Sequence, residues 1–353
     1  MFFLRRRKAE LLGIDISTTA VKLIELSRTG NRFRVESYGV APLPADAIGD
    51  KNVARAEAIG SVIRAVVKQS GTRLKHAAVA VPGSAVIAKV IAMPAALTED
   101  EMEAQLELEA DQYIPYALDE VSLDFLVQGP TENNPDMVDV LLVASRKENV
   151  GDRVAALDVA GLKAEIVDVE SYALENACSL VLEQVAQPSS EQAIAIADVG
   201  AMMTTLNVVY DRRIIYTREQ SFGGKQLTEE IQRRYGLSYD EAGLAKKHGG
   251  LPDNYEPEVL EPFKSALSQQ IGRSLQFFLS SGTQRNVASI ILAGGCASIP
   301  GIDRYVEEAL GTPTLIANPF LNMTLSSRIK PQALTSDAPA LMTACGLALR
   351  SFD

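Results

Sequence analysis

The sequence predicts an α/β protein built from two duplicated domains, with a small subdomain inserted into the first. Two stretches, residues 11–26 (LLGIDISTTAVKLIEL) and 194–209 (IAIADVGAMMTTLNVV), have the same design. Each begins with an apolar run that delivers an Asp, continues with Gly or hydroxyl residues, and finishes with a β-rich run. That order predicts a strand, a polar turn and a returning strand. At 353 residues, the chain is long enough for two such domains.

The first repeat belongs to a module of strands and one helix. Gly30-Asn31 is a hairpin signal between the second and third strands, and Pro82-Gly83 ends the last strand. Residues 52–70 carry apolar side chains at helical spacing, which predicts an amphipathic helix. The predicted strands cover residues 11–16, 21–27, 33–42 and 77–81.

The next segment, residues 84–161, has its own β-α-β-β-α pattern, which predicts the inserted subdomain. Its first helix is strongly acidic and begins with a capping box formed by Thr98 and Glu101. Gly161 ends its second helix. The strands are expected at residues 86–93, 121–128 and 137–145, and the helices at 99–112 and 147–160.

The rest of the chain returns to the first domain and then repeats its plan. A strand (164–169) and a helix (171–185) precede residues 187–192, a polar segment that is the clearest linker. The later elements are expected at residues 194–199, 204–210, 213–219, 223–278 (interrupted at 248–253), 289–293, 303–310 and 338–350. The expected units are a first domain (1–83, 162–190 and 331–353), the insert (84–161), a second domain (191–222 and 289–330) and its helical subdomain (223–288).

Composition excludes several classes of function. The net charge of −11 and the pI near 4.9 argue against nucleic acid as the main partner, because phosphate backbones need a basic surface. Three widely spaced cysteines make no disulfide framework, and two histidines give little support to a transition-metal site. We expect neither a transmembrane helix nor a secretory signal. The basic residues 5–8 are expected to form a solvated tail, with weak contact to an anionic membrane surface as the alternative.

The polar turns of the two repeats are candidate phosphate sites. Their carboxylates can orient a hydrated divalent ion, while hydroxyls and backbone N–H groups bind phosphate oxygens. One such turn alone is compatible with an ordinary link between strands, but two matching turns favour a polyphosphate held between two halves. The candidates in the first turn are Gly13, Asp15, Ser17, Thr18, Thr19 and Lys22. Those in the second turn are Asp198, Gly200, Thr204 and Thr205, and the two Asp residues are the candidate metal ligands, through water.

Two further glycine pairs extend this candidate site. Gly294-Gly295 ends a strand and lets a flat group lie against the backbone. Gly224 belongs to a pair that opens a helix, where an anion can be bound. Lys225 and Lys246 are candidates for the ribose or adenine end, although solvated surface lysines would have the same sequence pattern.

Glu170 is the candidate catalytic residue. It follows the strand EIVDV, where its side chain would face the γ-phosphate across the cleft, and Asp168 lies two residues earlier. A structural carboxylate at a strand end is the alternative for both residues. The sequence contains neither a G-x-S-x-G elbow nor a G-x-x-x-x-G-K-[ST] motif, so a P-loop protein is excluded.

The ordered set GIDISTT, ADVGAMMTT and LAGGCASIPG, followed by an Ala-rich helix, resembles the actin-like ATPase superfamily. The resemblance implies ATP and a divalent ion in a cleft between two ribonuclease H-like domains. The insert resembles that of the bacterial division protein FtsA. More narrowly, segments that include EADQYIPYALDEVSLDF, LLVASRKENV, REQSFGGKQLTEEIQRRYGLSYDEAGLAKK, SLQFFLSS and APALMTACGLALRSF resemble the PilM family of type IV pilus assembly proteins, in order and over nearly the whole chain.

The PilM resemblance implies a cytoplasmic adaptor, peripheral at the inner membrane, that supports pilus biogenesis and twitching motility. It would bind the N-terminal cytoplasmic tail of PilN in a groove between the first module and the insert. PilO would be an indirect partner, and motor ATPases, the platform protein and self-association are further expectations. ATP or ADP with Mg²⁺ would occupy the two turns, Gly294 and Gly295 would form the adenosine motif, and Gly224 and Lys246 would lie beside it.

One departure from the superfamily pattern bears on catalysis. Many hydrolytic relatives have D-x-G-x-G-T in the second turn, whereas a Met stands here at the second Gly position. A side chain there restricts backbone approach to the γ-phosphate, which predicts slow hydrolysis more than loss of binding. The alternatives are an FtsA-like filament-forming cytoskeletal ATPase and a sugar or small-molecule kinase on the same fold.

Overall fold

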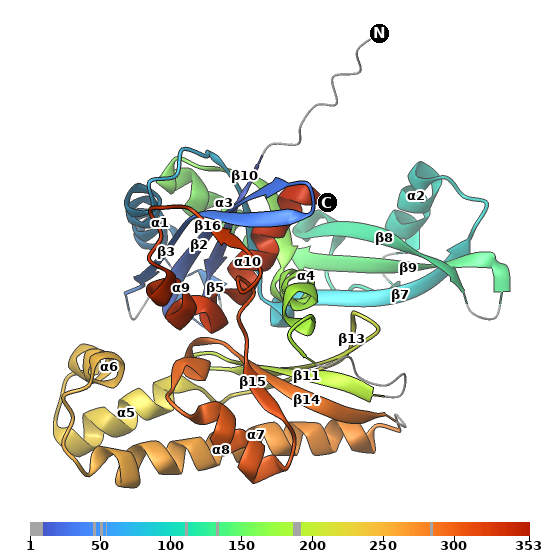
Figure 1. Cartoon of the computed structure of the whole chain (residues 1–353). Coiled ribbons are helices and arrows are strands. Elements are labelled where there is room, and N and C mark those ends of the chain that lie inside the picture. The colour runs from blue at the N-terminus through green and yellow to red at the C-terminus, as the bar shows by residue number, and fades with distance from the viewer. Residues whose placement is uncertain are drawn as a thin grey trace.

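Two sheets, one in each half of the chain, form the centre of the computed structural model (Figure 1). The structure describes residues 10–44, 47–49, 52–53, 55–109, 112–131, 134–185, 192–282 and 285–353. The first sheet contains, in spatial order, β10 (Lys163–Val169), β6 (His76–Val81), β1 (Leu12–Ile16), β2 (Ala20–Thr29), β3 (Arg32–Pro42) and β16 (Thr324–Leu325). The second contains β13 (Arg213–Gln220), β12 (Thr204–Tyr210), β11 (Gln192–Val199), β14 (Asn286–Ala293) and β15 (Thr314–Ile316).

The two sheets repeat one plan. β1 pairs antiparallel with β2 and parallel with β6, and β11 pairs antiparallel with β12 and parallel with β14. Every residue of β1 is buried, as a central strand covered on both faces requires, which explains its continuous apolar run. The duplicated α/β fold expected from the matched stretches is therefore confirmed.

The insert is a three-stranded antiparallel sheet of order β7-β9-β8 that projects from the side of the first domain (Figure 1). Its strands are β7 (Val86–Pro94), β8 (Val121–Thr131) and β9 (Asn134–Arg146). One face is covered by α2 (Glu99–Glu109), whose Met102 and Leu106 share a core with Val140 and Leu142. The expected capping box is present, because Thr98 Oγ1 accepts from the N–H of Glu101 at 3.3 Å and the Glu101 carboxylate accepts from the N–H of Thr98 at 2.9 Å.

The helix α3 (Lys147–Ala160) packs against the first domain, although its sequence position had suggested the insert. Its Ala156 and Leu157 lie in the same core cluster as Ile59 and Ile63 of α1 (Ala56–Ser70). Gly60 permits this close crossing, since a Cβ there would lie 2.7 Å from the Ala156 carbonyl oxygen.

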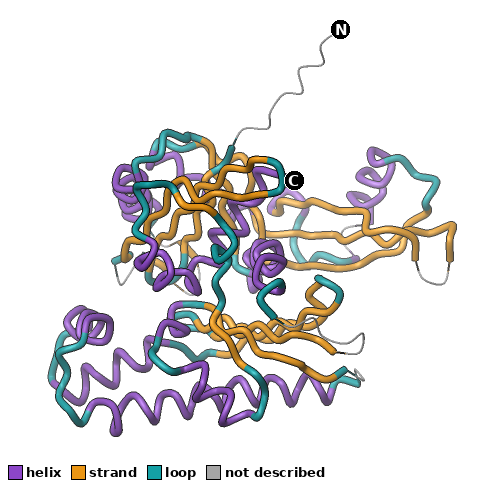
Figure 2. Tube along the Cα trace, viewed as in Figure 1, coloured by secondary structure: helices purple, strands orange, loops and turns teal. Residues whose placement is uncertain are grey.

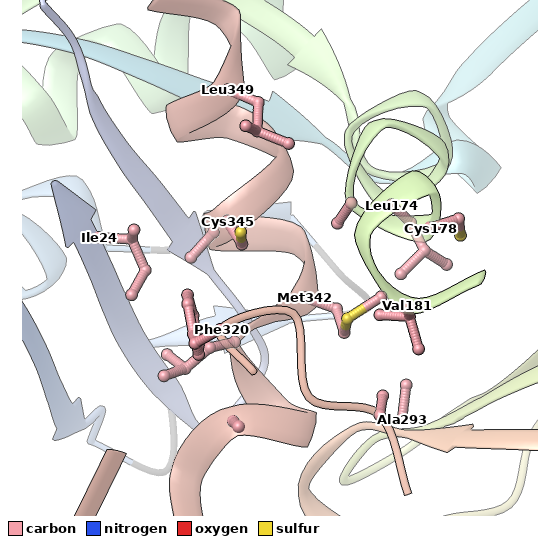
Figure 3. Packing of buried hydrophobic residues seen from close by; sticks show 14 of the residues in the cluster. Ile24, Leu174, Cys178, Val181, Ala293, Phe320, Met342, Cys345 and Leu349 are labelled. Carbon is pink, nitrogen blue, oxygen red and sulfur yellow. The ribbon is translucent and has the colours of Figure 1, made fainter. Parts of the chain in front are cut away.

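A shared core holds the two halves together. α4 (Glu170–Leu182) and α10 (Met342–Leu349) lie between the sheets, and Figure 3 shows Leu174, Val181, Met342 and Cys345 of these helices between Ile24 of the first sheet and Ala293 of the second. A Cβ on Gly346 would overlap the carbonyl group of Ala173, so this glycine sets the closeness of the two helices. The helices α4 and α10 therefore connect the two domains at the cleft between them.

The remaining helices lie mostly on the outer side of the second sheet, whereas α9 lies with the first domain (Figure 1 and Figure 2). They are α5 (Gly224–Tyr235), α6 (Tyr239–His248), α7 (Glu261–Ser280), α8 (Ile302–Leu310) and α9 (Pro331–Asp337), with the short pair β4 (Ile48–Gly49) and β5 (Asn52–Val53) at the side of the first sheet. The predicted helix 52–70 begins later, at Ala56, because residues 52–53 pair with β4. The predicted terminal helix 338–350 begins with a 3₁₀ turn, Ala338–Leu341, which contains Pro339.

Within the part of the chain that the structure describes, no helix combines the length and the apolar character needed to cross a membrane. The basic residues 5–8 and most of the predicted linker, residues 187–191, lie outside the described residues.

Candidate functional site

The turn between β1 and β2 is closed by its own hydroxyl. The N–H and Oγ of Ser17 both donate to the Ala20 carbonyl, at 3.0 and 2.9 Å. Thr18 and Thr19 occupy the tip, and the carbonyl of Thr19 accepts from the N–H of Leu43 at 2.9 Å. Thr19 is the exposed residue of this turn, and Thr18 is half-buried. Gly13 lies farther back, where a Cβ would overlap the Ala344 carbonyl of α10, so its lack of a side chain serves packing.

Asp15 and Lys22 form the charged centre of this hairpin. They are cross-strand partners, and Lys22 Nζ lies 2.8 Å from Asp15 Oδ2. The side chain of Lys22 is only 15% exposed and that of Asp15 only 7%. Burial lowers the pKa of Lys22, but the carboxylates of Asp15, Asp198 and Glu170 outweigh that effect and raise it. Asp198 belongs to the second domain, so carboxylates of both halves of the chain contribute to the raised pKa of this one ammonium group.

The second turn, between β11 and β12, has the same place in its sheet. Gly200 closes it by donating its N–H to the Met203 carbonyl at 2.9 Å. Asp198 is the ladder partner of Thr205, and both line the cleft. Thr204 faces the opposite side: it is buried and its hydroxyl donates to the Phe222 carbonyl at 2.9 Å. Thr204 therefore holds the turn in place from inside the domain.

The start of α5 is bound to the second turn. The N–H groups of Gly224 and Lys225 donate to the carbonyls of Gly200 and Ala201, at 3.0 and 2.8 Å. The amide of Gly224, which belongs to the glycine pair predicted to face an anion, and the amide of Lys225 thus fix the turn. Lys246 Nζ donates to the Gly224 carbonyl at 3.1 Å and to the Thr228 hydroxyl at 2.6 Å, and burial lowers its pKa. The structure directs this ammonium group into the protein.

The glycine pair Gly294-Gly295 contacts the second turn directly. Gly294 has φ +82°, and a Cβ there would overlap Asp198 Oδ1 and lie 2.6 Å from the carbonyl carbon of Val199. Its neighbour Gly295 differs, because a Cβ on Gly295 would meet no atom within 4 Å. The first glycine therefore permits close packing against Asp198, and the second leaves open space beside it.

Glu170 is the first residue of α4 and lines the cleft together with Asp198. Asp168 does not: its Oδ2 accepts from Arg350 Nε at 2.7 Å, and its Oδ1 accepts from the N–H of Val169 at 2.7 Å. The structure therefore separates the two candidates, with Glu170 at the cleft and Asp168 in an ion pair that fastens the C-terminal segment to β10.

Sequence reasoning missed Arg153 of α3. Its side chain is buried, Nε donates to the Ala80 carbonyl at 3.2 Å, and burial lowers its pKa while Glu170, Asp152 and Asp15 oppose that shift. Its position on the apolar stripe of a predicted helix was the available signal, since a charged residue on a buried face requires a partner. Arg153 contributes positive charge behind the first turn.

Two duplicated sheets joined by central helices, each with an Asp-bearing strand that leads into a hairpin turn, define an actin-like protein. The chain belongs to the PilM family, because the family described as type IV pilus assembly protein PilM matches residues 13–352. Its fold is similar to the solved PilM-PilN type IV pilus biogenesis complex, with a TM-score of 0.80 and 28% identity over 98% of this chain and 99% of that chain. The predicted resemblance is thereby confirmed.

More distant relatives share the fold. The chain is 21% identical over 352 residues to the cell division protein FtsA of Bacillus subtilis, covering 87% of this chain and 78% of FtsA. It also matches the ethanolamine utilization protein EutJ from Carboxydothermus hydrogenoformans, with a TM-score of 0.54 and 14% identity over 96% of this chain and 89% of that chain.

Proposed function

We propose that this protein is an ATP-binding adaptor of the type IV pilus assembly platform that binds the N-terminal cytoplasmic tail of PilN. The observation that carries the nucleotide part is the pair of matched hairpins, in which Asp15 and Asp198 have equivalent positions on the strand before each turn. The observation that carries the partner is the similarity to the PilM-PilN complex over almost the whole chain.

The described residues fit a nucleotide with Mg²⁺. The open tip of the first turn (Thr18 and Thr19) and Thr205 of β12 would bind phosphate oxygens, and Gly295 leaves room for the adenosine. Asp15 and Asp198 would hold Mg²⁺ through water. No group of three metal-binding side chains exists among the described residues, so phosphate oxygens would complete the ion's coordination. Gly13, Thr204, Gly224 and Lys246 would act by shaping the site rather than by touching the nucleotide.

Slow turnover is part of the proposal. Bound Mg²⁺ would supply charge neutralisation at the phosphates. Glu170, at the start of α4 and in the same field as Lys22, is the residue proposed to orient a water, and Met202 fills the tip of the second turn with a side chain that is 38% exposed. A glycine at that position would leave the backbone open to a phosphate, so the methionine favours retention of the nucleotide over rapid hydrolysis.

The insert supplies a surface for an extended peptide. α2 covers one face of its sheet, whereas the opposite face carries Val90, Leu141 and Leu126 in one cross-strand row. Val90 and Leu126 are 58% and 63% exposed, which is unusual for neighbouring aliphatic residues on a sheet. We propose that apolar side chains of the PilN tail pack on this face of the insert. The Tyr116 ring, with Arg146 4.3 Å from its centroid, holds the other side of the insert together.

The remaining roles follow from the family. The protein would lie on the cytoplasmic side of the inner membrane, where PilN would hold it. PilO would be an indirect partner, reached through PilN. Contact with motor ATPases and the platform protein, self-association and a contribution to twitching motility belong to the same proposal.

Two titrations test the proposal. Fluorescent ATP with Mg²⁺ should bind the full chain, and D198N should weaken that binding while S336A, a control with an exposed hydroxyl on α9, should not. A synthetic PilN tail should bind the full chain, and V90D or L126D should weaken tail binding with unchanged ATP binding. Failure of ATP to bind would remove the nucleotide part, and failure of the tail to bind would remove the adaptor part.

A further inference from the structure

A polar cavity of ≈ 450 Å³ lies in the cleft beyond the phosphate turns. Its walls come from α4, from β12 and β13, and from the base of the insert at Gly83, Ser84 and Ala88. Figure 1 shows β7 of the insert above β13 of the second domain at this end of the cleft. The cavity begins at Asp198 and Thr205 and then extends along the strands away from the turns.

The inner end of the cavity is formed by Asn207 and Thr217, which are ladder partners on β12 and β13. Asn207 is two residues beyond Thr205, which places it about 7 Å farther along the strand. The hydroxyl of Thr217 donates to Asn207 Oδ1 at 2.8 Å. This part of the cavity is therefore separate from the hairpin turns.

Asn207 has an unmet hydrogen-bonding group. Its side chain is fully buried, yet Nδ2 has no acceptor among the described residues. A buried amide donor without a partner is costly, so such groups are rare unless a ligand or water satisfies them. With Oδ1 taken by Thr217, the nitrogen is the end that a ligand oxygen would meet.

The charged side chains that line the cavity are all carboxylates: Glu170, Glu175, Asp198 and Glu219. Burial raises the pKa of Glu175, even though the N–H of Ile214 and the charges of Arg213 and Arg350 oppose that shift. Away from the turns, Glu175 and Glu219, whose carboxylate lies near Gly83 at the base of the insert, would repel a phosphate group, so this part of the cavity does not extend the proposed phosphate site. A bare metal ion would be opposed by the amide donor of Asn207. The wall therefore suits a ligand that carries both a positive charge and a neutral acceptor oxygen.

The cavity also reaches the edge of the second sheet, where Ile214, Thr217 and Glu219 of β13 line it. β13 is the edge strand of its sheet, so one of its sides is unpaired by other strands of that sheet. Cavities of this size hold ligands of a few residues.

We infer that the cavity binds a short basic peptide segment, with a main-chain carbonyl accepting from Asn207 Nδ2 and a Lys or Arg side chain beside Glu175 and Glu219. This goes beyond the proposed function, because it assigns a second site in the cleft that requires neither the nucleotide nor the apolar face of the insert.

Three capped pentapeptides test the inference: Ala-Ala-Lys-Ala-Ala and its counterparts with Glu or Met at the centre. Each is titrated into the full chain, and binding is followed by nuclear magnetic resonance at the side-chain amide of Asn207, assigned from its loss in N207L. The Lys peptide should bind and shift this signal, and the Glu peptide should bind on the order of ten-fold more weakly or not at all. N207L should weaken Lys-peptide binding by about ten-fold.

The matched control is N176L. Asn176 also has a buried Nδ2 without a partner in the described chain, but it does not line the cavity, so Lys-peptide affinity should stay unchanged. If N207L does not fold, E219Q takes its place and should weaken binding of the Lys peptide but not of the Met peptide. Equal binding of Lys and Glu peptides, no binding at millimolar concentration, or unchanged affinity in N207L would overturn the inference. ATP is also titrated into the same samples, so that a failure of peptide binding can be distinguished from a failure of nucleotide binding.

Discussion

Replacing Gly294 by Ala should destabilise the protein and weaken nucleotide binding together. At φ +82°, a side chain costs roughly 1–2 kcal/mol. The added Cβ would also overlap Asp198 Oδ1 and lie 2.6 Å from the Val199 carbonyl carbon, and overpacking of this kind costs about 1–3 kcal/mol more. The free energy of unfolding should therefore fall by about 2–5 kcal/mol.

This loss can be measured as a shift in Tm. An unfolding entropy of about 2.1 cal/mol/K per residue over 353 residues converts the loss into roughly 3–7 °C. ATP affinity should fall at the same time, because the overlap displaces Asp198. G295A is the control, since its Cβ enters open space and should leave Tm nearly unchanged. Equal Tm values for G294A and G295A would refute the reasoning.

Three further predictions concern the same cleft. K22M should lower the free energy of unfolding by about 3 kcal/mol in denaturant titrations, because it leaves the buried Asp15 carboxylate unpaired, and adding D15N should recover most of the loss. The pKa of Lys22 is raised above 10.5, so the stabilisation by the Lys22–Asp15 pair should be fully present below pH 10.5. It should be lost as the pH rises through the raised pKa. A loss of this stabilisation already at about pH 8 would contradict the prediction. E175Q should stabilise the protein at neutral pH, because burial raises the pKa of Glu175 above 4.5 and the charged form opposes folding; thermal scans should show the gain disappear below pH 4.5, and destabilisation at pH 7 would count against the assignment. G295L should leave Tm within about 2 °C of the wild type but weaken ATP binding at least ten-fold, and unchanged affinity would show that the adenosine lies elsewhere.

The sequence predicted the architecture because the duplicated pattern is local. An apolar strand that must be buried on both faces, followed by a polar turn, appears twice, and nothing else in the chain competes with that interpretation. The insert was visible for the same reason, since its alternating strands and acidic helix differ from the modules around it. The positions of Asp198 and Glu170 at the cleft could be expected from the sequence, because turns and strand ends are where side chains reach a cleft.

The orientation of single residues was harder to predict, because it depends on contacts between distant segments. Thr204 and Thr205 are adjacent on β12 and therefore face opposite sides; the Thr204 hydroxyl donates to the Phe222 carbonyl, whereas Thr205 lines the cleft. Lys246 is separated from Gly224 by 22 residues, and their hydrogen bond exists only after α5 and α6 pack together. The position of α3 required the complementary surface of α1, where Gly60 admits it.

The central claim is that binding of nucleotide in the cleft and binding of the partner peptide to the insert are coupled. The most direct measurement is the affinity of the full chain for a synthetic PilN tail, determined by calorimetry with and without ATP and Mg²⁺. If nucleotide favours the form of the protein that binds the tail, ATP should tighten tail binding, and the tail should tighten ATP binding by the same factor. A tail affinity that does not change when ATP saturates the protein would contradict the claim.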